Sequence, residues 1–154
     1  MTMTLTSSAF APGGRIPVDH TCDGADLSPP FAWSGVPAGT RSLLLVCDDV
    51  DAPGGIFRHW AAFDIPPAWT GLEAGYGPET LEPGFRQAIN DFKKPGWGGP
   101  CPPEGDVPHH YHFRLSALAE PIVGAAPGAT CLEVQTLARP LVIDFVELVG
   151  VYGR

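Results

Sequence analysis

Short apolar or alternating segments, separated by glycine and proline, make up most of the chain. Residues 41–47 form a continuous apolar run with the length of a strand that is buried on both faces. Residues 141–152 are rich in Val, Ile and Phe and predict a final strand, which Gly150 is expected to break near its end. Alternation of polar and apolar residues predicts three more strands, the first of them at a sheet edge, over residues 2–5, 59–65 and 109–118. The pattern favours a β-rich domain.

The alternation also assigns side chains to the faces of two of these strands. One face of the strand over 59–65 is predicted to carry His59, Ala61, Phe63 and Ile65. In the strand over 109–118, one face is predicted to carry His109, Tyr111, Phe113 and Leu115, and the other His110, His112 and Arg114. His59 and His109 therefore lie where a loop enters a strand.

One segment has a convincing helix signal. Thr130 followed three positions later by Glu133 forms a capping box, and the helix must end before Pro140. We expect this short helix to pack on the sheet edge. Residues 95–108 contain four glycines and five prolines, which is too many for a helix or a central strand, so they predict a shaped loop that leads to His109.

Composition and charge narrow the class of protein. With 154 residues, 44% of them hydrophobic, and no linker or repeat, residues 1–154 are expected to form a single domain. The net charge of −8, with only two lysines, disfavours binding to nucleic acid or to anionic lipid surfaces. We find no basic start followed by an apolar run and no transmembrane segment, so we expect the protein in the cytoplasm, where thiols are usually reduced.

Two aspartates directly follow the apolar run. Asp49 and Asp51 project to the same side if the chain stays extended, and paired carboxylates repel each other unless a cation, a metal or a shared proton lies nearby. On composition alone, a solvated aspartate-rich turn that caps its own backbone is the commoner explanation. The neighbouring segments are what favour a binding site.

Those segments carry hydrogen-bond donors. His59, His109 and Tyr111 each lie where a loop meets a strand, beside the glycine-rich residues 98–105, whose backbone N–H groups are expected to be exposed. A protonated imidazole, a phenol and a glycine amide suit phosphate or carboxylate oxygens, while the aspartates can hold an imidazolium or an ammonium group. Taken singly, a histidine is more often an ordinary hydrogen-bonded strand residue than a ligand. Together, these groups predict a pocket for a zwitterion.

Two motifs in order resemble the signatures of a known family. Residues 49–53 (Asp-Val-Asp-Ala-Pro) and residues 99–103 followed by His109-His-Tyr111 resemble the two signatures of the phosphatidylethanolamine-binding (Raf kinase inhibitor-like) family. Residues 21–24, 28–30 and 32–33 resemble its bacterial and archaeal branch. The resemblance implies a mainly β fold, an antiparallel sandwich with one or two short helices, and a pocket for small anions or phosphorylated head groups without a cofactor. The ligand-binding residues it implies are Asp49, Asp51, Ala52, Pro53, His59, Gly99, Pro100, His109 and Tyr111.

The resemblance extends to cysteines and partners. Cys22 and Cys101 lie in segments that resemble the pocket-side loops and could approach each other, so a disulfide between them is the alternative to the reduced thiols expected in the cytoplasm. Cys47 and Cys131 are expected to be small core residues. A homodimer is a reasonable expectation, and family analogy suggests that the protein regulates a kinase or a protease.

A hydrolase or metal-assisted enzyme is the alternative from another class. Asp49, Asp51, His59 and His109 could converge on a metal. The sequence contains no Cys-x-x-Cys pair, no Gly-x-Ser-x-Gly elbow and no phosphate-binding Walker loop. Binding without catalysis is therefore the leading hypothesis.

Overall fold

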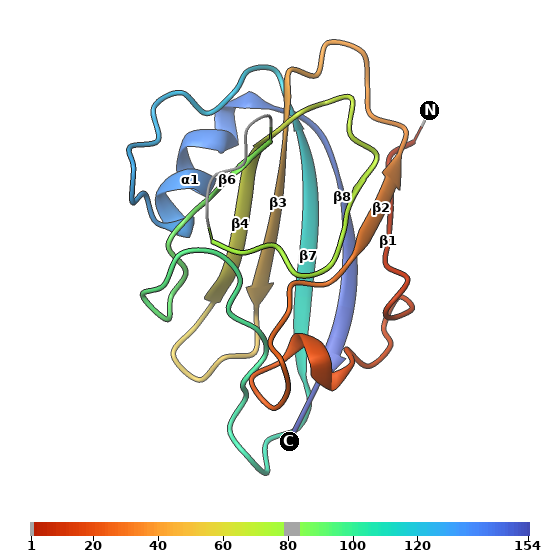
Figure 1. Ribbon diagram of the computed structural model, residues 1–154, viewed down its shortest axis with the longest axis vertical. Coiled ribbons are helices and arrows are strands. Elements are labelled where there is room, and N and C mark those ends of the chain that lie inside the picture. Colours follow the sequence, from red (N-terminus) through yellow and green to blue (C-terminus); the bar gives the residue numbers. More distant parts are fainter. Residues whose placement is uncertain (1, 79–83) are drawn as a thin grey trace.

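Two antiparallel sheets form the molecule in a computed structural model that describes residues 2–78 and 84–154 (Figure 1). The larger sheet has the strand order β6-β4-β3-β7-β8, and the smaller has the order β1-β2-β5. The larger sheet consists of β6 (Arg86–Gln87), β4 (Phe57–Ile65), β3 (Ser42–Asp49), β7 (His109–Leu118) and β8 (Val142–Tyr152). The smaller consists of β1 (Thr4–Thr6), β2 (Phe31–Ser34) and β5 (Gly71–Leu72). The mainly β, sandwich-like fold predicted from the sequence is confirmed.

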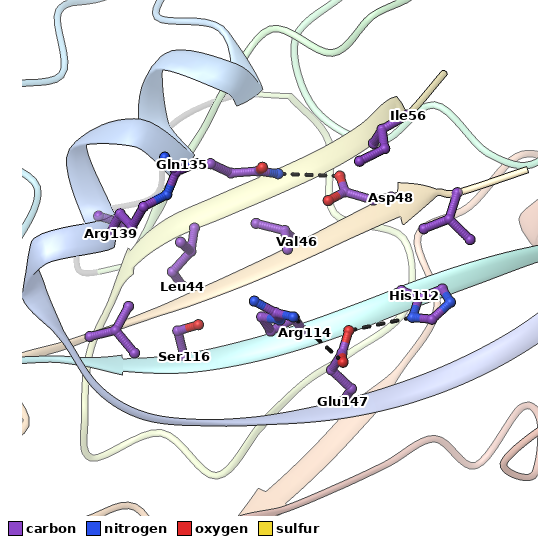
Figure 2. Close-up of a pocket in the computed structure, with 13 residues that line it drawn as sticks. Leu44, Val46, Asp48, Ile56, His112, Arg114, Ser116, Gln135, Arg139 and Glu147 are labelled. Atoms are coloured by element: carbon purple, nitrogen blue, oxygen red, sulfur yellow. Dashed lines mark hydrogen bonds and ion pairs between the residues drawn. The ribbon is translucent and has the colours of Figure 1, made fainter. Parts of the chain in front are cut away.

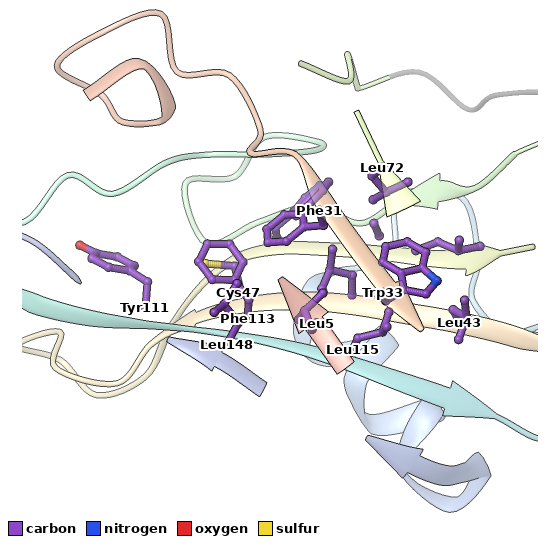
Figure 3. Packing of buried hydrophobic residues seen from close by; sticks show 14 of the residues in the cluster. Leu5, Phe31, Trp33, Leu43, Cys47, Leu72, Tyr111, Phe113, Leu115 and Leu148 are labelled. Atoms are coloured by element: carbon purple, nitrogen blue, oxygen red, sulfur yellow. The ribbon is translucent and has the colours of Figure 1, made fainter. Parts of the chain in front are cut away.

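The main core lies between the two sheets. Its side chains come from β1, β2 and β5 on one side and from β3, β4, β7 and β8 on the other, and they include Leu5, Phe31, Trp33, Leu43, Phe113 and Leu115 (Figure 3). The central strand β3 is buried over nearly all of its length, as its apolar run predicts. A well-packed core of this kind fixes the positions of the strand ends, where the polar residues of interest lie.

Strand β7 follows the prediction closely. It begins at His109 and ends at Leu118, and Tyr111, Phe113 and Leu115 are buried in the core between the sheets. The prediction that His109 shares a face with these residues, opposite His110 and Arg114, is confirmed, because alternation is preserved wherever pairing is regular. Pairing with β3 runs without a shift from Ser42 opposite Leu118 to Asp49 opposite Tyr111.

Strand β4 departs from the predicted alternation at two points. Two residues of β3 (Cys47, Asp48) pair with Trp60 and Arg58, so the intervening His59 is the extra residue of a β-bulge. A second irregularity lies before Ile65, where Asp64 has a φ of 58°. The prediction that His59, Ala61, Phe63 and Ile65 share one face is therefore wrong. Ala61 and Phe63 pack beneath the helix, and Ile65 packs between the sheets.

Helix α1 (Cys131–Ala138) begins at the capping box that the sequence predicts. The Thr130 side chain accepts a hydrogen bond from the Glu133 N–H, and the Glu133 carboxylate accepts one from the Thr130 N–H. A short 3₁₀ turn, Arg139–Leu141, follows it and contains Pro140. The expected packing on the sheet edge is wrong. Val134 and Ala138 instead join a second core on the outer face of β3 and β4 with Leu44, Val46, Ala61 and Phe63.

Gly150 does not break the final strand, contrary to the prediction. Strand β8 continues to Tyr152, and Gly150 pairs with Tyr111 of β7. A Cβ atom at position 150 would lie 2.7 Å from Ile16 Cγ1 and 2.8 Å from a ring carbon of Phe10. The glycine is needed because the N-terminal segment crosses the strand closely at this point.

Candidate functional site

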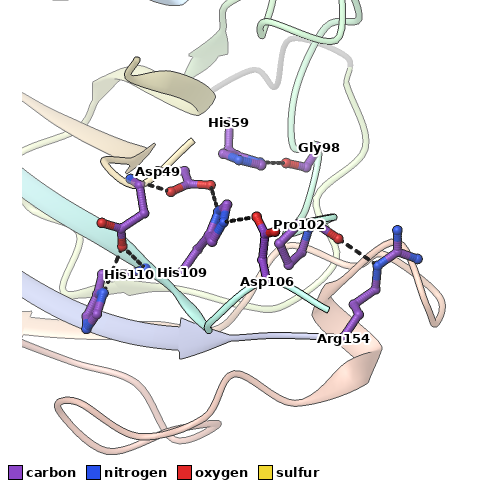
Figure 4. Close-up of polar contacts among 9 residues, drawn as sticks. Asp49, His59, Gly98, Pro102, Asp106, His109, His110 and Arg154 are labelled. Carbon is purple, nitrogen blue, oxygen red and sulfur yellow. Dashed lines mark hydrogen bonds and ion pairs between the residues drawn. The ribbon is translucent and has the colours of Figure 1, made fainter. Parts of the chain in front are cut away.

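A buried aspartate–histidine pair joins the ends of two neighbouring strands. Asp49 ends β3, His109 begins β7, and Asp49 Oδ2 lies 2.7 Å from His109 Nδ1 (Figure 4). Their side chains are only 5% and 4% exposed. The Asp106 carboxylate lies 3.2 Å from the other ring nitrogen, Nε2. Because ionised carboxylates only accept hydrogen bonds, this arrangement favours hydrogen on both ring nitrogens and the imidazolium form of His109.

The electrostatics agree with this assignment. Burial by itself would lower the pKa of His109, but the hydrogen bonds and charges of Asp49 and Asp106 raise the pKa above its ordinary value. The sequence predicts that the aspartates after the apolar run and the loop that leads to His109 form one pocket. The contact between Asp49 and His109 confirms that these two segments meet.

His59 reaches the same region because of the bulge in β4. The rings of His59 and Tyr111 are perpendicular, with centroids 5.3 Å apart. His59 Nδ1 donates a hydrogen bond to the Gly98 carbonyl, and burial lowers the pKa of His59. The imidazole is therefore neutral at pH 7, and its Nε2 is a hydrogen-bond acceptor. The expectation of a protonated imidazole fits His109 and does not fit His59.

The Tyr111 hydroxyl is buried and has no hydrogen-bond partner of normal length among the described residues, although the Asp49 carboxylate lies near enough to act on it. Burial, followed by the nearby charge of Asp49, raises the pKa of Tyr111 well above its ordinary value. The phenol therefore stays protonated and can donate a hydrogen bond. A buried hydroxyl without a partner is unfavourable, so this group is available to a guest molecule.

These groups line one cavity of about 120 Å³. Six of the predicted ligand-binding residues line it, and they are Asp49, Ala52, Pro53, His59, His109 and Tyr111. The sequence reasoning missed the other lining residues, which are Phe57, Phe92, Cys101, Pro102 and Pro103. Phe57 lies two positions before His59, and the prolines lie inside the predicted loop, so proximity to the motifs was the available signal. The cavity thus has polar groups within a largely apolar wall.

Three predicted residues do not line this cavity. The chain turns after Asp49, whose Oδ1 accepts a hydrogen bond from the Asp51 N–H at 2.8 Å. Asp51 Oδ2 instead accepts hydrogen bonds from His110, from Nδ1 at 2.8 Å and from the backbone N–H at 2.7 Å (Figure 4). The expectation that the two aspartates project to the same side is therefore wrong. The side-chain hydrogen bond from His110 is the main reason that the pKa of Asp51 is lowered.

Gly99 and Pro100 are the other two predicted residues that do not line the cavity. The Gly99 N–H donates to Asp26 Oδ1 at 2.9 Å, so the expected free glycine amide is already used. A Cβ at this position would collide with the Asp26 carboxylate and the His20 carbonyl. Gly99 is therefore required by the packing of its loop. The Pro100 carbonyl accepts a hydrogen bond from the Cys22 N–H at 3.1 Å, which holds the two loops together.

The same two loops are joined covalently. Cys22 and Cys101 form a disulfide with a Cα–Cα distance of 5.4 Å, so the expectation of reduced thiols is wrong for this pair. Cys47 and Cys131 are free and buried, as predicted. Disulfides are rare in cytoplasmic proteins, and the cytoplasmic location stays a prediction.

A larger cavity of about 470 Å³ lies on the outer face of the five-stranded sheet, beside α1 (Figure 2). Most of its charged groups already have partners: Glu147 lies 3.4 Å from His112 and 3.5 Å from Arg114, and the Gln135 amide donates to Asp48 at 3.2 Å. None of the predicted site residues lines it. We therefore place the candidate site in the smaller cavity.

Within residues 2–78 and 84–154, no three His, Cys, Asp or Glu side chains are grouped in a way that could hold a metal ion. No helix in the same residues has the length and apolar character needed to cross a membrane.

Fold and site together define the class of protein: an antiparallel two-sheet protein whose buried aspartate–histidine pair lines a small cavity at the strand ends. The family model described as phosphatidylethanolamine-binding protein matches residues 6–153. The chain belongs to this family, as the two sequence motifs predicted.

Individual relatives and a solved structure support the same family membership. The chain is 44% identical to the UPF0098 protein of Methanothermobacter thermautotrophicus over 154 residues, which cover 99% of each chain. It is 40% identical to the UPF0098 protein of Aquifex aeolicus over 152 residues, 99% of this chain and 89% of the relative. The structure of Escherichia coli YbcL, described as a new member of the mammalian PEBP family, superimposes with a TM-score of 0.89 at 33% identity and covers 100% of this chain and 99% of that one. These matches support a bacterial or archaeal member of the family.

Proposed function

We propose that the cavity binds the phosphate group of a small molecule, either a free phosphate-type anion or a phosphoethanolamine-like head group, and that the chain acts by binding without catalysis. The observation that carries the proposal is the buried Tyr111 hydroxyl, which lines the cavity and has no hydrogen-bond partner among the described residues. A phosphate oxygen that accepts this hydrogen bond recovers the free energy otherwise lost by burying the hydroxyl alone.

The polar groups favour a partly protonated phosphate or a zwitterion. Tyr111 donates, the imidazolium of His109 supplies positive charge, and His59 Nε2 accepts. A fully ionised phosphate offers only acceptors and gives no hydrogen to His59. A monohydrogen phosphate has one O–H, and an ethanolamine head group has an ammonium, so either satisfies His59.

The size of the cavity supports a small group. Its volume of about 120 Å³ is below the roughly 300 Å³ at which pockets for drug-sized ligands begin. The apolar wall, which includes Phe57 and Phe92, suits the short methylene segment of a head group, while a long acyl chain would extend outside.

The family relationship, rather than the geometry of the cavity, supports the second part of the proposal. In this part, binding of a phosphorylated group on a partner protein regulates a kinase or a protease, and the chain acts as a homodimer. Light scattering determines the oligomeric state, and retention of a candidate kinase or protease on the immobilised chain, with competition by phosphate, tests the partner.

Calorimetric titration with inorganic phosphate and with phosphoethanolamine tests the binding site. Tyr111→Phe should weaken binding about tenfold, because a hydrogen bond to a charged group is lost. Tyr76→Phe removes the same hydroxyl from a tyrosine that does not line the cavity, and it should leave the affinity unchanged. Absence of binding by the unmodified chain would refute the proposal. Release of phosphate from a phosphomonoester, dependent on His109, would favour the hydrolase alternative.

A further inference from the structure

Two carboxylates contact His109, and they differ in how firmly they are held. Asp49 ends a central strand, is 5% exposed, and lies 2.7 Å from the ring. Asp106 lies in the exposed loop before β7, its side chain is 41% exposed, and its bond to the ring is longer, at 3.2 Å. Of the two, Asp106 is the weaker partner, because an exposed ionic bond contributes little free energy.

The loop that carries Asp106 is anchored at residues 101 and 102, by the disulfide and by a hydrogen bond from Arg154 Nε to the Pro102 carbonyl at 2.9 Å. Beyond that point its attachments are few: the Asp106 N–H bonds to the Pro103 carbonyl at 3.3 Å, the Gly105 N–H bonds to the Arg154 carbonyl at 3.2 Å, and Glu104 lies 3.9 Å from Arg154. Val107, next in sequence, is 81% exposed. A segment with so little buried contact area can rearrange locally at low cost in free energy.

Asp106 also lines a second cavity, of about 290 Å³, next to the candidate site. Two cations line this second cavity, Arg15 and Arg154. Arg154 is paired with Asp23 at 3.0 Å. Arg15 forms no ion pair within the part of the chain that the structure describes, and its guanidinium lies 5.1 Å from the centre of the Tyr152 ring. A carboxylate that leaves His109 on this side therefore meets an unpaired cation.

His109 Nε2 is at the same time the donor that an anion in the candidate cavity would use. The ring lines that cavity, and its other nitrogen is held by Asp49. With Asp106 in place, the Tyr111 hydroxyl is the one buried side-chain donor without a partner among the described residues that line the cavity. The Asp106 carboxylate lines the second cavity and not the candidate one, but its bond to His109 Nε2 takes up the ring donor that a phosphate oxygen in the candidate cavity needs.

We propose that Asp106 is an exchangeable internal anion: it occupies the ligand's place at His109 Nε2, and it moves toward Arg15 when a phosphate oxygen takes that place. The inference rests on the proposed function and adds a specificity-determining residue to it. A ligand must replace a carboxylate at His109 and also accept from Tyr111, so an anion that cannot make both contacts binds poorly.

Three substitutions separate this exchange from a general charge effect. Asp106→Ala should tighten the binding of inorganic phosphate about tenfold, because the competitor for His109 is removed. Glu104→Ala removes the same charge from the same loop at a side chain that is 81% exposed and lies 3.9 Å from Arg154 instead of bonding to His109. It should change the affinity less than about twofold. Arg15→Gln should weaken binding about threefold in the unmodified background and leave it unchanged in the Asp106→Ala background, because no carboxylate remains to be received.

Calorimetry with inorganic phosphate and NMR titration of the His109 ring provide the two measurements. Without ligand, Asp106→Ala should lower the pKa of His109, while Glu104→Ala should not. The inference that Asp106 exchanges with the ligand is wrong if Asp106→Ala and Glu104→Ala raise the affinity equally. It is also wrong if the unmodified chain binds phosphate and Asp106→Ala does not raise the affinity. Either result would leave the proposed binding site unchanged. If neither the unmodified chain nor Asp106→Ala binds phosphate or phosphoethanolamine, the proposed function fails and the exchange fails with it.

Discussion

Replacing Cys22 and Cys101 together by serine removes the cross-link between the loop at the start of the chain and the loop that lines the candidate cavity. The two cysteines are separated by 79 residues. For a closed loop of that length, chain entropy predicts a loss of about 4.5 kcal/mol in the free energy of unfolding. That is a large fraction of the roughly 5–15 kcal/mol by which a typical domain is stable.

Urea denaturation followed by tryptophan fluorescence measures this loss. With a slope of about 2 kcal/mol per molar urea, the midpoint should fall by about 2 M. The unmodified chain in reductant should behave as the double-serine variant does, and reductant should have no effect on the variant itself. Cys47 and Cys131 are free and buried in both proteins, so a difference in the effect of reductant is due to the disulfide between Cys22 and Cys101.

A count of reactive thiols determines whether the cross-link is present. The chain has four cysteines, of which two are free. Denatured without reductant it should therefore expose two thiols, and after reduction four. A difference in unfolding free energy of less than about 1 kcal/mol between an oxidised chain and the double-serine variant would refute the entropic reasoning.

Three further predictions concern the site and the fold. The pKa of His109 is raised in the folded state, so its stabilising effect is complete below the unfolded pKa of about 6.5 and is lost as the pH rises through the folded pKa. His109→Gln should therefore cost more stability at about pH 5 than at about pH 9, and equal losses would contradict the assigned imidazolium. Gly150→Ala should destabilise the fold by about 1–3 kcal/mol through overpacking against Ile16, whereas Gly54→Ala, with open space around it, should have little effect in the same urea titration. Thr130→Ala should cost about 1 kcal/mol by removing the helix cap, and a thermal melt without a shift would contradict the role of the capping box.

Local patterns predicted the elements whose geometry is set by neighbours in sequence. Strand β7 and the start of α1 follow directly from alternation and from the Thr130–Glu133 capping box. The family motifs predicted that Asp49 and His109 belong to one site, and β3 and β7 bring the two side chains into contact because these strands are hydrogen-bonded neighbours.

The sequence alone could not define the register in which neighbouring strands pair. The bulge at His59 exists only in the register between β3 and β4, and it alone places this histidine on the side of the cavity. The sequence also could not define which distant group each hydrogen-bond donor and acceptor would meet. Gly99 is held by Asp26, 73 residues earlier in the chain, which removes the amide that the motif appeared to offer to a ligand.

The sequence by itself determined the class of fold, the single capped helix and the identity of the acidic and histidine-bearing segments, because each of these depends on residue types at short, regular spacing. Only the tertiary structure decided that Asp51 faces His110, that Cys22 is joined to Cys101, and that Asp106 occupies the second nitrogen of His109. The physical reason is that hydrogen bonds and disulfides require specific distances and directions, and these arise only after distant segments have packed together.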